Sequence, residues 1–289
     1  MNVCIVGCGY VGSTLATLLL EQGACVFGLR RRVDHLPIGV EPLAIDIFHA
    51  EALRRGLPEA LDALVFAAAV GRGADQGDYK RLYVDGLRHV IAALEARGQR
   101  PRLLFTSSTG VYGQDDHRWV DERSPTEPAS FSGRCMVEAE RLLSACSLET
   151  CAVRFGGIYG PDRTFLLRQV AQGQAKRSDV LHYTNRIHRD DCAAVLSHLL
   201  NQRTLAPCYV AVDDQPAPHN DVLCYLAELL GVAAPEVGPR AQRTRGGSKR
   251  CNNRLLRESG YQLIYPSYRE GYRALVSADV PKTRPSDVD

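Results

Sequence analysis

The sequence predicts an α/β fold, in which helices cover both faces of a parallel sheet. Short and nearly continuous apolar runs alternate with longer amphipathic segments, and a glycine-rich turn joins the first run to the first helical segment. Strands that are buried on both faces lose the polar alternation of exposed sheets, as these runs do. The 289 residues, 45% of them hydrophobic, are enough for one large domain with a smaller lobe.

The elements follow one another in regular order. The predicted strands are NVCIVG (2–7), CVFGL (25–29), LAI (43–45), ALVFAAA (63–69), RLLFTSS (102–108), TCAVRF (150–155) and CYVAV (208–212). The predicted helices include STLATLLLEQG (13–23), YVDGLRHVIAALEARG (83–98), MVEAERLLSACS (136–147), DDCAAVLSHLLNQ (190–202) and NDVLCYLAELLG (220–231). Crossovers between parallel strands are right-handed, which gives a doubly wound sheet.

The alternation becomes less regular after residue 160, which divides the chain. We predict a sheet domain over 1–160, completed by 186–212, and a smaller C-terminal lobe formed by 161–185 and 213–278. The polar segment 279–289 is predicted to be a flexible tail.

One segment of the lobe, 235–254, is rich in Gly, Pro and Arg. It carries a basic run of Arg240, Arg243, Arg245, Lys249 and Arg250. A solvated loop is the favoured interpretation of this run, and contact with an anionic substrate or a phosphate is the alternative.

Composition limits the classes of function. With 35 basic and 33 acidic side chains the net charge is +2, so no general field favours nucleic acid or a membrane surface as a partner. The ten cysteines are scattered without a CxxC pair, which favours reduced core thiols over metal or disulfide chemistry, and therefore a cytoplasmic location. No apolar run is long enough for a membrane span.

The segment Gly7-Cys8-Gly9-Tyr10-Val11-Gly12 is a GxGxxG turn between the first strand and the first helix. Gly7 permits the tight turn, Gly9 lets the backbone approach a diphosphate, and Gly12 allows close helix packing. The helix N-terminus adds partial positive charge. The sequence therefore predicts a dinucleotide site, which includes Tyr10 and Val11.

The end of the second strand points to the form of the dinucleotide. An NAD-binding protein usually places an acid there for the ribose 2′-hydroxyl, whereas this chain has Arg30, Arg31 and Arg32. Guanidinium groups suit a 2′-phosphate, so NADP(H) is predicted in preference to NAD(H). A solvated arginine run is the alternative. Further along the predicted cofactor surface lie Asp46, Ile47, Ala67, Ala68 and Ala69.

Several segments together resemble the extended short-chain dehydrogenase/reductases, the NAD(P)-dependent epimerase/dehydratase group. They are GCGYVG (7–12), FTSSTGVYG (105–113), VRFGGIYGP (153–161), RIHRDDCAAVL (186–196) and YVAVDDQP (209–216). The resemblance implies an NADP-binding Rossmann domain, a small-molecule site between it and the substrate-binding lobe, and a homodimer built through helices 79–97 and 132–147. It also implies cofactor contacts from Ser107, Gly157 and Ile158.

The resemblance fails at two catalytic positions. The family motif YGxSKxxAE, laid on SGRCMVEAE, puts Ser132 where the family has its proton-transferring Tyr and Met136 where it has the Lys. Gly133 and Ala139-Glu140 match the motif, so the alignment is anchored. The end of the chain, SKRCNNRLLRESGY, is likewise similar to atypical members with a degenerate active site.

Other residues could take part in the chemistry. The resemblance makes Ser108 a hydrogen-bond donor to substrate, and Tyr112 a candidate for proton transfer, with packing beside the site as its alternative. Arg134, at the start of the same helix, is a substrate candidate that is more simply explained as exposed. Arg186 and His188 are candidate substrate contacts, His188 being equally well explained as a core residue, and Asp190 is expected to cap a helix.

Three functions remain open on the sequence. The favoured one is an NADP(H)-dependent oxidoreductase or epimerase-like enzyme of atypical type, acting on a small carbonyl or imine metabolite. The second is a non-catalytic NADP(H)-binding sensor or scaffold, which the missing Tyr and Lys would suit. The third is an isomerase or dehydratase that recycles its cofactor.

Overall fold

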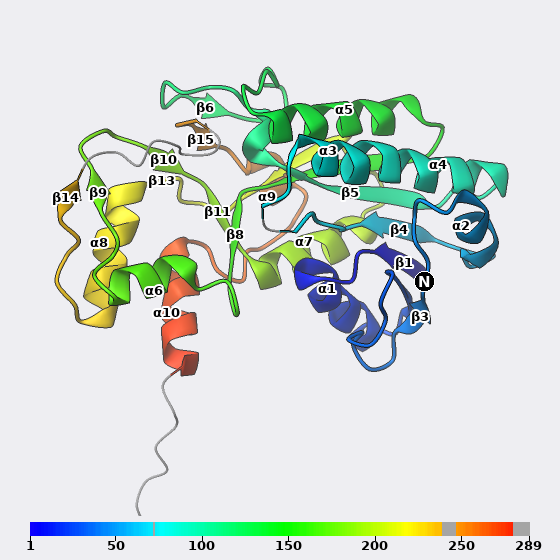
Figure 1. The fold of residues 1–289 in the computed structure, drawn as a ribbon, viewed down its shortest axis with the longest axis horizontal. Coiled ribbons are helices and arrows are strands. Elements are labelled where there is room, and N and C mark those ends of the chain that lie inside the picture. The colour runs from blue at the N-terminus through cyan, green and yellow to red at the C-terminus, as the bar shows by residue number, and fades with distance from the viewer. Residues whose placement is uncertain (72, 239–246, 280–289) are drawn as a thin grey trace, which may run out of the picture.

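A computed structural model describes residues 1–71, 73–238 and 247–279. In this part of the chain a seven-stranded parallel sheet has the order β12-β7-β5-β4-β1-β2-β3 (Figure 1). Its strands are β1 (Asn2–Val6), β2 (Cys25–Leu29), β3 (Glu41–Leu43), β4 (Ala63–Phe66), β5 (Arg102–Ser108), β7 (Thr150–Phe155) and β12 (Cys208–Ala211). The predicted doubly wound Rossmann-type α/β fold is confirmed.

The helical segments lie along both faces of this sheet and in the lobe. They are α1 (Tyr10–Glu21), α2 (Ala50–Gly56), α3 (Gln76–Tyr79), the π-helical η1 (Lys80–Gly86), α4 (Leu87–Ala96), the 3-10 turn η2 (Thr109–Val111), α5 (Phe131–Ala145), α6 (Phe165–Ala171), α7 (Arg189–Leu200), α8 (His219–Leu230), α9 (Arg254–Glu258) and α10 (Tyr268–Asp279). Short strands complete the list: β6 (Trp119–Val120), β8 (Gly157–Tyr159), β9 (Arg177–Ser178), β10 (Tyr183–Thr184), β11 (Arg186–His188), β13 (Ala217–Pro218), β14 (Val237–Gly238) and β15 (Arg250–Cys251).

Several predicted boundaries shift: β4 ends at Phe66 instead of residue 69, and α5 begins at Phe131 instead of residue 136. Two other elements change more clearly. The third strand was expected at 43–45, but β3 is Glu41–Leu43 because its ladder with β2 ends where Leu29 faces Leu43. The long helix expected over 79–97 is divided into α3, η1 and α4, with a π-helical turn at its centre. The tail 280–289 and the arginines Arg240, Arg243 and Arg245 lie outside the described residues.

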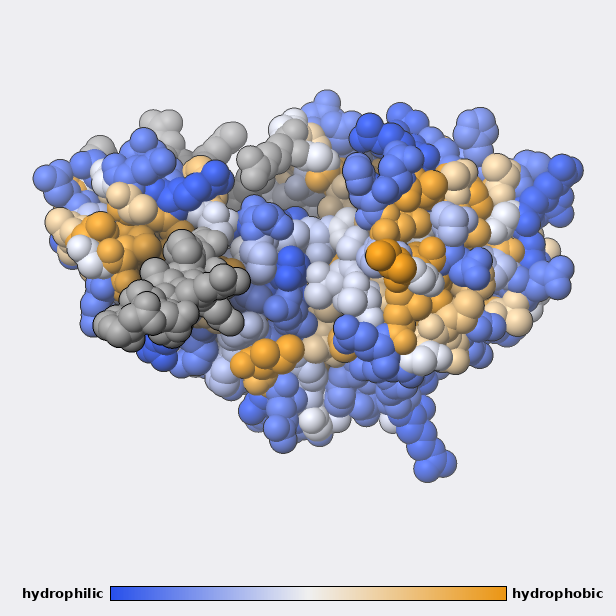
Figure 2. Space-filling view, turned by 90° about the horizontal axis from the view of Figure 1, so that it is seen from below, coloured by the Kyte–Doolittle hydropathy of each residue, from blue (hydrophilic) through white to orange (hydrophobic). Residues whose placement is uncertain are grey.

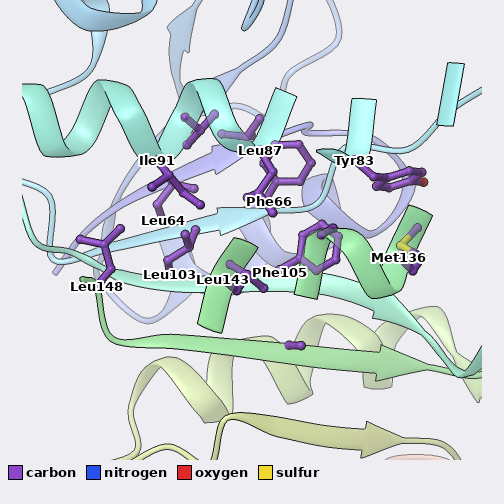
Figure 3. Packing of buried hydrophobic residues seen from close by; sticks show 14 of the residues in the cluster. Leu64, Phe66, Tyr83, Leu87, Ile91, Leu103, Phe105, Met136, Leu143 and Leu148 are labelled. Carbon is purple, nitrogen blue, oxygen red and sulfur yellow. The ribbon is translucent and has the colours of Figure 1, made fainter. Parts of the chain in front are cut away.

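Separate hydrophobic clusters fill the two faces of the sheet. Helices α4 and α5 cover one face, where Phe66 and Phe105 meet with ring centroids 5.8 Å apart, Leu87 lying next to Phe66 and Leu143 next to Phe105 (Figure 3). Helices α1 and α7 cover the other face, with Leu19 buried in that cluster. Each such side chain contributes about 1.5–3 kcal/mol when removed from water.

A third cluster lies in the C-terminal lobe, among α6, α8 and α10. Leu167, Leu226 and Tyr272 belong to it. Viewed from below, hydrophobic residues at the surface form separate groups on either side of a hydrophilic centre (Figure 2). No helix within the described ranges has the length and apolar content needed to cross a membrane.

A buried ion pair attaches α5 to the sheet. Glu140 of α5 accepts from Arg154 of β7 at both carboxylate oxygens, over 3.0 Å to Oε1 and 2.6 Å to Oε2, and its Oε1 also accepts from Ser107 of β5 at 2.6 Å. The side chains of Arg154 and Glu140 are only 8% and 13% exposed. Such a pair tolerates the loss of neither partner, because the remaining charge stays buried.

We predict that Glu140→Ala lowers the free energy of unfolding by about 3–5 kcal/mol, because the Arg154 guanidinium then lacks its counter-charge. Urea denaturation measures the change. Glu51→Ala, which removes an exposed partner of Arg54 and Arg55, should lower the free energy of unfolding far less, because solvent screens an exposed ion pair. Equal effects of the two substitutions would contradict the importance given to the buried pair.

Candidate functional site

A cavity of about 1480 Å³ opens at the carboxyl ends of the central strands and extends to the lobe. In doubly wound sheets ligands bind at this edge, near the point where the strand order reverses, which is between β1 and β4 here. Fourteen of the fifteen predicted cofactor residues line it: Gly7, Gly9, Tyr10, Val11, Arg30, Arg31, Asp46, Ile47, Ala67, Ala68, Ala69, Ser107, Gly157 and Ile158. Gly12, the other one, packs beneath the loop.

The glycine loop has the shape that a dinucleotide requires. Gly7 has φ +92°, and a Cβ there would lie 2.3 Å from the Cα of Ala68; a Cβ on Gly12 would lie 2.3 Å from the carbonyl oxygen of Gly7. A Cβ on Gly9 would meet nothing within 4 Å, so the space above this residue is open. Helix α1 begins there without a side-chain cap, and its first amide groups remain available to an anion. These features fit a nicotinamide dinucleotide.

The arginines after β2 lie at one end of the cavity. Arg30 donates from Nη1 to the carbonyl oxygen of Cys8, 3.0 Å away, so its guanidinium is held beside the glycine loop. Arg31 is exposed, and Arg32 lines the same region. Asp46 accepts from the backbone amide of Phe48, which fixes the turn after β3. This end of the cavity therefore has permanent positive charge.

Tyr10 of the glycine loop is clamped by residues that sequence analysis missed. The guanidinium carbon of Arg163 lies 4.1 Å from the centroid of the Tyr10 ring, and that of Arg189 lies 5.3 Å away. The Tyr10 hydroxyl donates to the carbonyl oxygen of Pro161 at 2.7 Å. Arg163 also lines the cavity, close to the glycine loop. Only the fold brings this segment, 151 residues away, to Tyr10.

Ser108 lies at the carboxyl end of β5 and lines the cavity. Its Oγ accepts from the amide of Gly110 at 3.0 Å and so caps the η2 turn. A serine hydroxyl that accepts in this way still has its hydrogen to donate. Ser107 also lines the cavity, but its hydroxyl donates to Glu140.

Helix α5 presents Ser132 and Met136 to the same cavity. Ser130 caps the helix by accepting from the amide of Gly133, and Ser132 donates to Ser130 over 3.3 Å. A Cβ on Gly133 would lie 2.4 Å from the carbonyl oxygen of Gly110, so this glycine lets α5 pack directly against the η2 turn. Met136 is 7% exposed and offers no titratable group.

Three predicted residues are not brought to the cavity. The Tyr112 hydroxyl is buried, donates to the carbonyl oxygen of Asp121 at 2.7 Å and accepts from Arg154 at 2.8 Å, and burial raises its pKa. This geometry argues against proton transfer by Tyr112. Arg134 donates to the carbonyl oxygen of Ala129 at the surface.

His188, the third of these residues, is 2% exposed and caps α7 by accepting from the amide of Asp190 at its Nδ1. It therefore takes the capping role that was expected of Asp190, which lies in the first turn instead. Its ring lies between Tyr159 and Tyr265. These contacts favour the core interpretation of His188.

Arg186 and Lys249 line the cavity from the side of the lobe. Arg186 is 8% exposed and donates to Thr184 Oγ1. Lys249 is 3% exposed, so the solvated-loop interpretation is wrong for this residue. Arg250 packs over the rings of Trp119 and Tyr183.

Behind Arg186 lies Asp213, which is 2% exposed. Its Oδ1 accepts from the amide of Gln215, and its Oδ2 has no hydrogen-bond partner among the described residues. Burial raises the pKa of Asp213 to about 8, against a smaller opposing effect of the Arg186 charge. Within the described ranges no three acidic, histidine or cysteine side chains are grouped closely enough to hold a metal ion.

Known proteins resemble this chain over most of its length. Residues 3–209 match the model of the NAD dependent epimerase/dehydratase family. Protein YeeZ of Escherichia coli K12 is 30% identical over 285 residues, covering 92% of this chain and 96% of the relative. The 3-diazoavenalumate denitrifying reductase of a Streptomyces species is 25% identical, covering 94% and 99%. A solved structure from Methylobacillus flagellatus, a candidate NAD-dependent epimerase/dehydratase, is 39% identical with a TM-score of 0.79, covering 96% and 98%.

We predict that Asp213→Asn raises the melting temperature at pH 8 and has a smaller effect at pH 5. The pKa of this carboxyl rises from 3.8 to about 8 on folding, so the folded state keeps a proton that the unfolded chain has released. Stability then falls as pH rises between these values, by up to about 1.4 kcal/mol per pH unit. Thermal melts from pH 4 to pH 9 test this.

Asp34→Asn, at an exposed aspartate, controls for the loss of one surface charge. A melting-temperature difference between Asp213→Asn and the parent that is the same at pH 5 and pH 8 would contradict a protonated Asp213.

Proposed function

The chain belongs to the NAD dependent epimerase/dehydratase family, and we propose that it is an NADP(H)-dependent oxidoreductase acting on a small carbonyl or imine metabolite. One observation carries the proposal: a single cavity joins the glycine loop, the arginines after β2 and Ser108. A cofactor held near the glycine loop and a carbonyl held near Ser108 would share this one cavity. A reductase among the full-length relatives agrees with this direction of chemistry.

The residues that would hold the cofactor have distinct tasks. The open backbone at Gly9 and the N-terminus of α1 suit a diphosphate, and Arg30 and Arg31 suit a 2′-phosphate. No acidic side chain follows β2 directly to accept a hydrogen bond from a free ribose 2′-hydroxyl, and this absence supports a preference for NADP(H) over NAD(H). When bound, a nicotinamide cofactor supplies or accepts a hydride.

Ser108 is suited to hold the substrate oxygen. Gly110 fixes the Oγ from one side, so the hydroxyl hydrogen can point into the cavity and donate to a carbonyl oxygen or an imine nitrogen. A serine hydroxyl is too weak an acid to complete the reduction alone at neutral pH. The proton must come from another group.

A non-catalytic NADP(H) sensor is the second candidate. The observation that favours it is Met136, a buried apolar residue at the helix position where the family has its Lys. In that case the cavity would bind cofactor without a substrate step. Turnover measurements separate the two proposals.

We also propose that the protein is a cytoplasmic homodimer. All ten cysteines are free, and burial raises the pKa of Cys151 and Cys192, among others. Unreactive thiols of this kind suit a reducing compartment. The predicted dimer helices correspond to α3–α4 and α5, which lie on the same face of the sheet.

For the cofactor, we expect NADPH to raise the melting temperature more than NADH does. The double variant Arg30→Ala/Arg31→Ala should narrow this difference, because it removes the charges offered to the 2′-phosphate. Differential scanning fluorimetry with each nucleotide measures both shifts. Arg55→Ala, on the surface of α2, is the control, and equal shifts for both nucleotides in the parent would refute the preference.

For the reaction, Ser108→Ala should lower kcat/KM by about 10²–10³-fold, the usual loss when one donor to a developing oxyanion is removed. The assay follows NADPH absorbance with aldehydes, α-keto acids, quinones and cyclic imines. Ser144→Ala, at the exposed far end of α5, is the matched control. A parent protein that consumes no NADPH with any of these compounds would favour the sensor.

A further inference from the structure

The chain uses lysine sparingly. Of its 35 basic residues, 31 are arginines and four are lysines, at positions 80, 176, 249 and 282. One of the four, Lys249, lies in the wall of the cavity. Arginine keeps its charge at any pH near neutrality, whereas lysine can release a proton. The cavity therefore contains a titratable cation in a chain whose cations are otherwise almost all permanent.

The backbone around Lys249 is fixed on both sides. The side chain of Asn185 donates to the carbonyl oxygen of Lys249 at 3.0 Å and accepts from the amide of Cys251 at 2.7 Å. Ser248 Oγ lies 2.6 Å from His117 Nδ1 and accepts from the amide of Tyr183 at 2.9 Å. Strands β15 and β6 pair directly after Lys249. The ammonium is thus presented from a rigid support, as a preorganised catalytic group requires.

The side chain of Lys249 reaches the turn that carries Ser108. Its Nζ donates to the carbonyl oxygen of Tyr112 at 3.0 Å, and Tyr112 is the residue that ends η2. Ser108, Gly110 and Lys249 all line the cavity. Ser108 therefore caps the start of the η2 turn with its hydroxyl, and the Lys249 ammonium binds the carbonyl oxygen at the end of the same turn.

The surroundings of Lys249 make it a stronger acid than an exposed lysine. Burial lowers its pKa, while the nearby Cys251 and Asp115 act in the opposite direction. A lysine whose pKa is lowered gives up its proton more readily than an exposed lysine and is therefore a more effective acid. Helix α5 provides no titratable group at Ser132 or Met136, so the proton has to come from another wall.

We propose that Lys249 is the catalytic proton donor of this site, acting from the lobe in place of the Tyr and Lys that α5 lacks. The inference rests on the proposed oxidoreductase function. A nicotinamide cofactor held at the glycine loop would supply the hydride that adds to the carbonyl carbon. The π pair then moves to oxygen, an N–H bond of the Lys249 ammonium breaks and an O–H bond forms. Lys249 keeps the N–H electron pair as a neutral amine and regains a proton from water, while Ser108 orients the oxygen.

Two substitutions test the role by kinetics. Lys249→Met and Lys249→Arg should each lower kcat by about 100-fold or more, the typical contribution of a positioned acid, with little change in KM. Arginine keeps the positive charge but does not release a proton. Lys249→Arg would therefore retain activity if Lys249 acted only by its charge or by positioning, and would lose activity if Lys249 donates the proton. The probes are 4-nitrobenzaldehyde and 9,10-phenanthrenequinone with NADPH, and melting curves establish folding. In the parent, kcat should fall as pH rises through the pKa of Lys249.

Lys176→Met is the matched control, because Lys176 forms an exposed ion pair with Glu236 at 3.0 Å. It should leave kcat and the pH profile unchanged.

A measurement without turnover tests the same residue. Incorporation of ¹³C-lysine during expression gives a Cε signal for each of the few lysines, and the Lys249 signal is the one missing from Lys249→Arg. Its NMR titration should have a midpoint below those of Lys80 and Lys176. A midpoint shared with these exposed lysines overturns the proposal.

The outcomes distinguish the acid role of Lys249 from the proposed oxidoreductase function. If the parent turns over a probe and Lys249→Met retains kcat within about threefold, far from the loss expected of an acid, the role of Lys249 is overturned and the oxidoreductase function stands. Recovery of kcat in Lys249→Arg also overturns the acid role. If the parent consumes no NADPH with either probe or the wider set of carbonyl compounds, the proposed function falls and the role of Lys249 falls with it.

Discussion

The buried pair of Glu140 and Arg154 is the interaction on which the rest of this site depends. Charges removed from water are tolerated only when their hydrogen bonds are complete, and here Ser107, Arg154 and the Tyr112 hydroxyl complete them. The pair thereby joins α5, β5 and β7 at one point. Because side chains alternate along a strand, fixing Ser107 towards Glu140 leaves Ser108 to face the other way. One ion pair thus fixes the helix and the strand end that carries Ser108, which lines the cavity.

The contacts that position α5 are distinct from the side chains that this helix presents to the cavity. Gly133 allows α5 to approach the η2 turn, and Glu140 anchors the helix below. Neither contact depends on which residues occupy the cavity-facing positions, so Ser132 and Met136 fit without disturbing the helix. Tyr112 likewise serves the framework, since its hydroxyl satisfies Arg154. A fold of this kind can keep its cofactor geometry while its proton donor changes.

Sequence reasoning was most successful where structure is local. The glycine loop, its strand and its helix are adjacent in the chain, and most of the predicted strands and helices were recovered. It was weakest where burial depends on distant segments. Lys249 was read as part of a solvated run because its neighbours are basic, yet its contact with Tyr112 spans 137 residues. Arg163 reaches the glycine loop only through the fold, and the His188 cap could not be distinguished from an Asp190 cap by residue type alone.

The distribution of cations in the cavity follows a physical division. The proposed phosphate recognition needs a charge that persists, and the part of the cavity near the glycine loop is lined by the arginines Arg30, Arg31 and Arg163. Proton transfer needs a charge that can leave and return, and Lys249 lines the same cavity. Exchanging the two residue types would weaken both proposed functions. An arginine in place of Lys249 would not release a proton, and a lysine in place of Arg30 or Arg31 could not bind a phosphate with two parallel hydrogen bonds. The residue type of each cation therefore fits the chemistry proposed for it, phosphate binding by arginine and proton transfer by lysine.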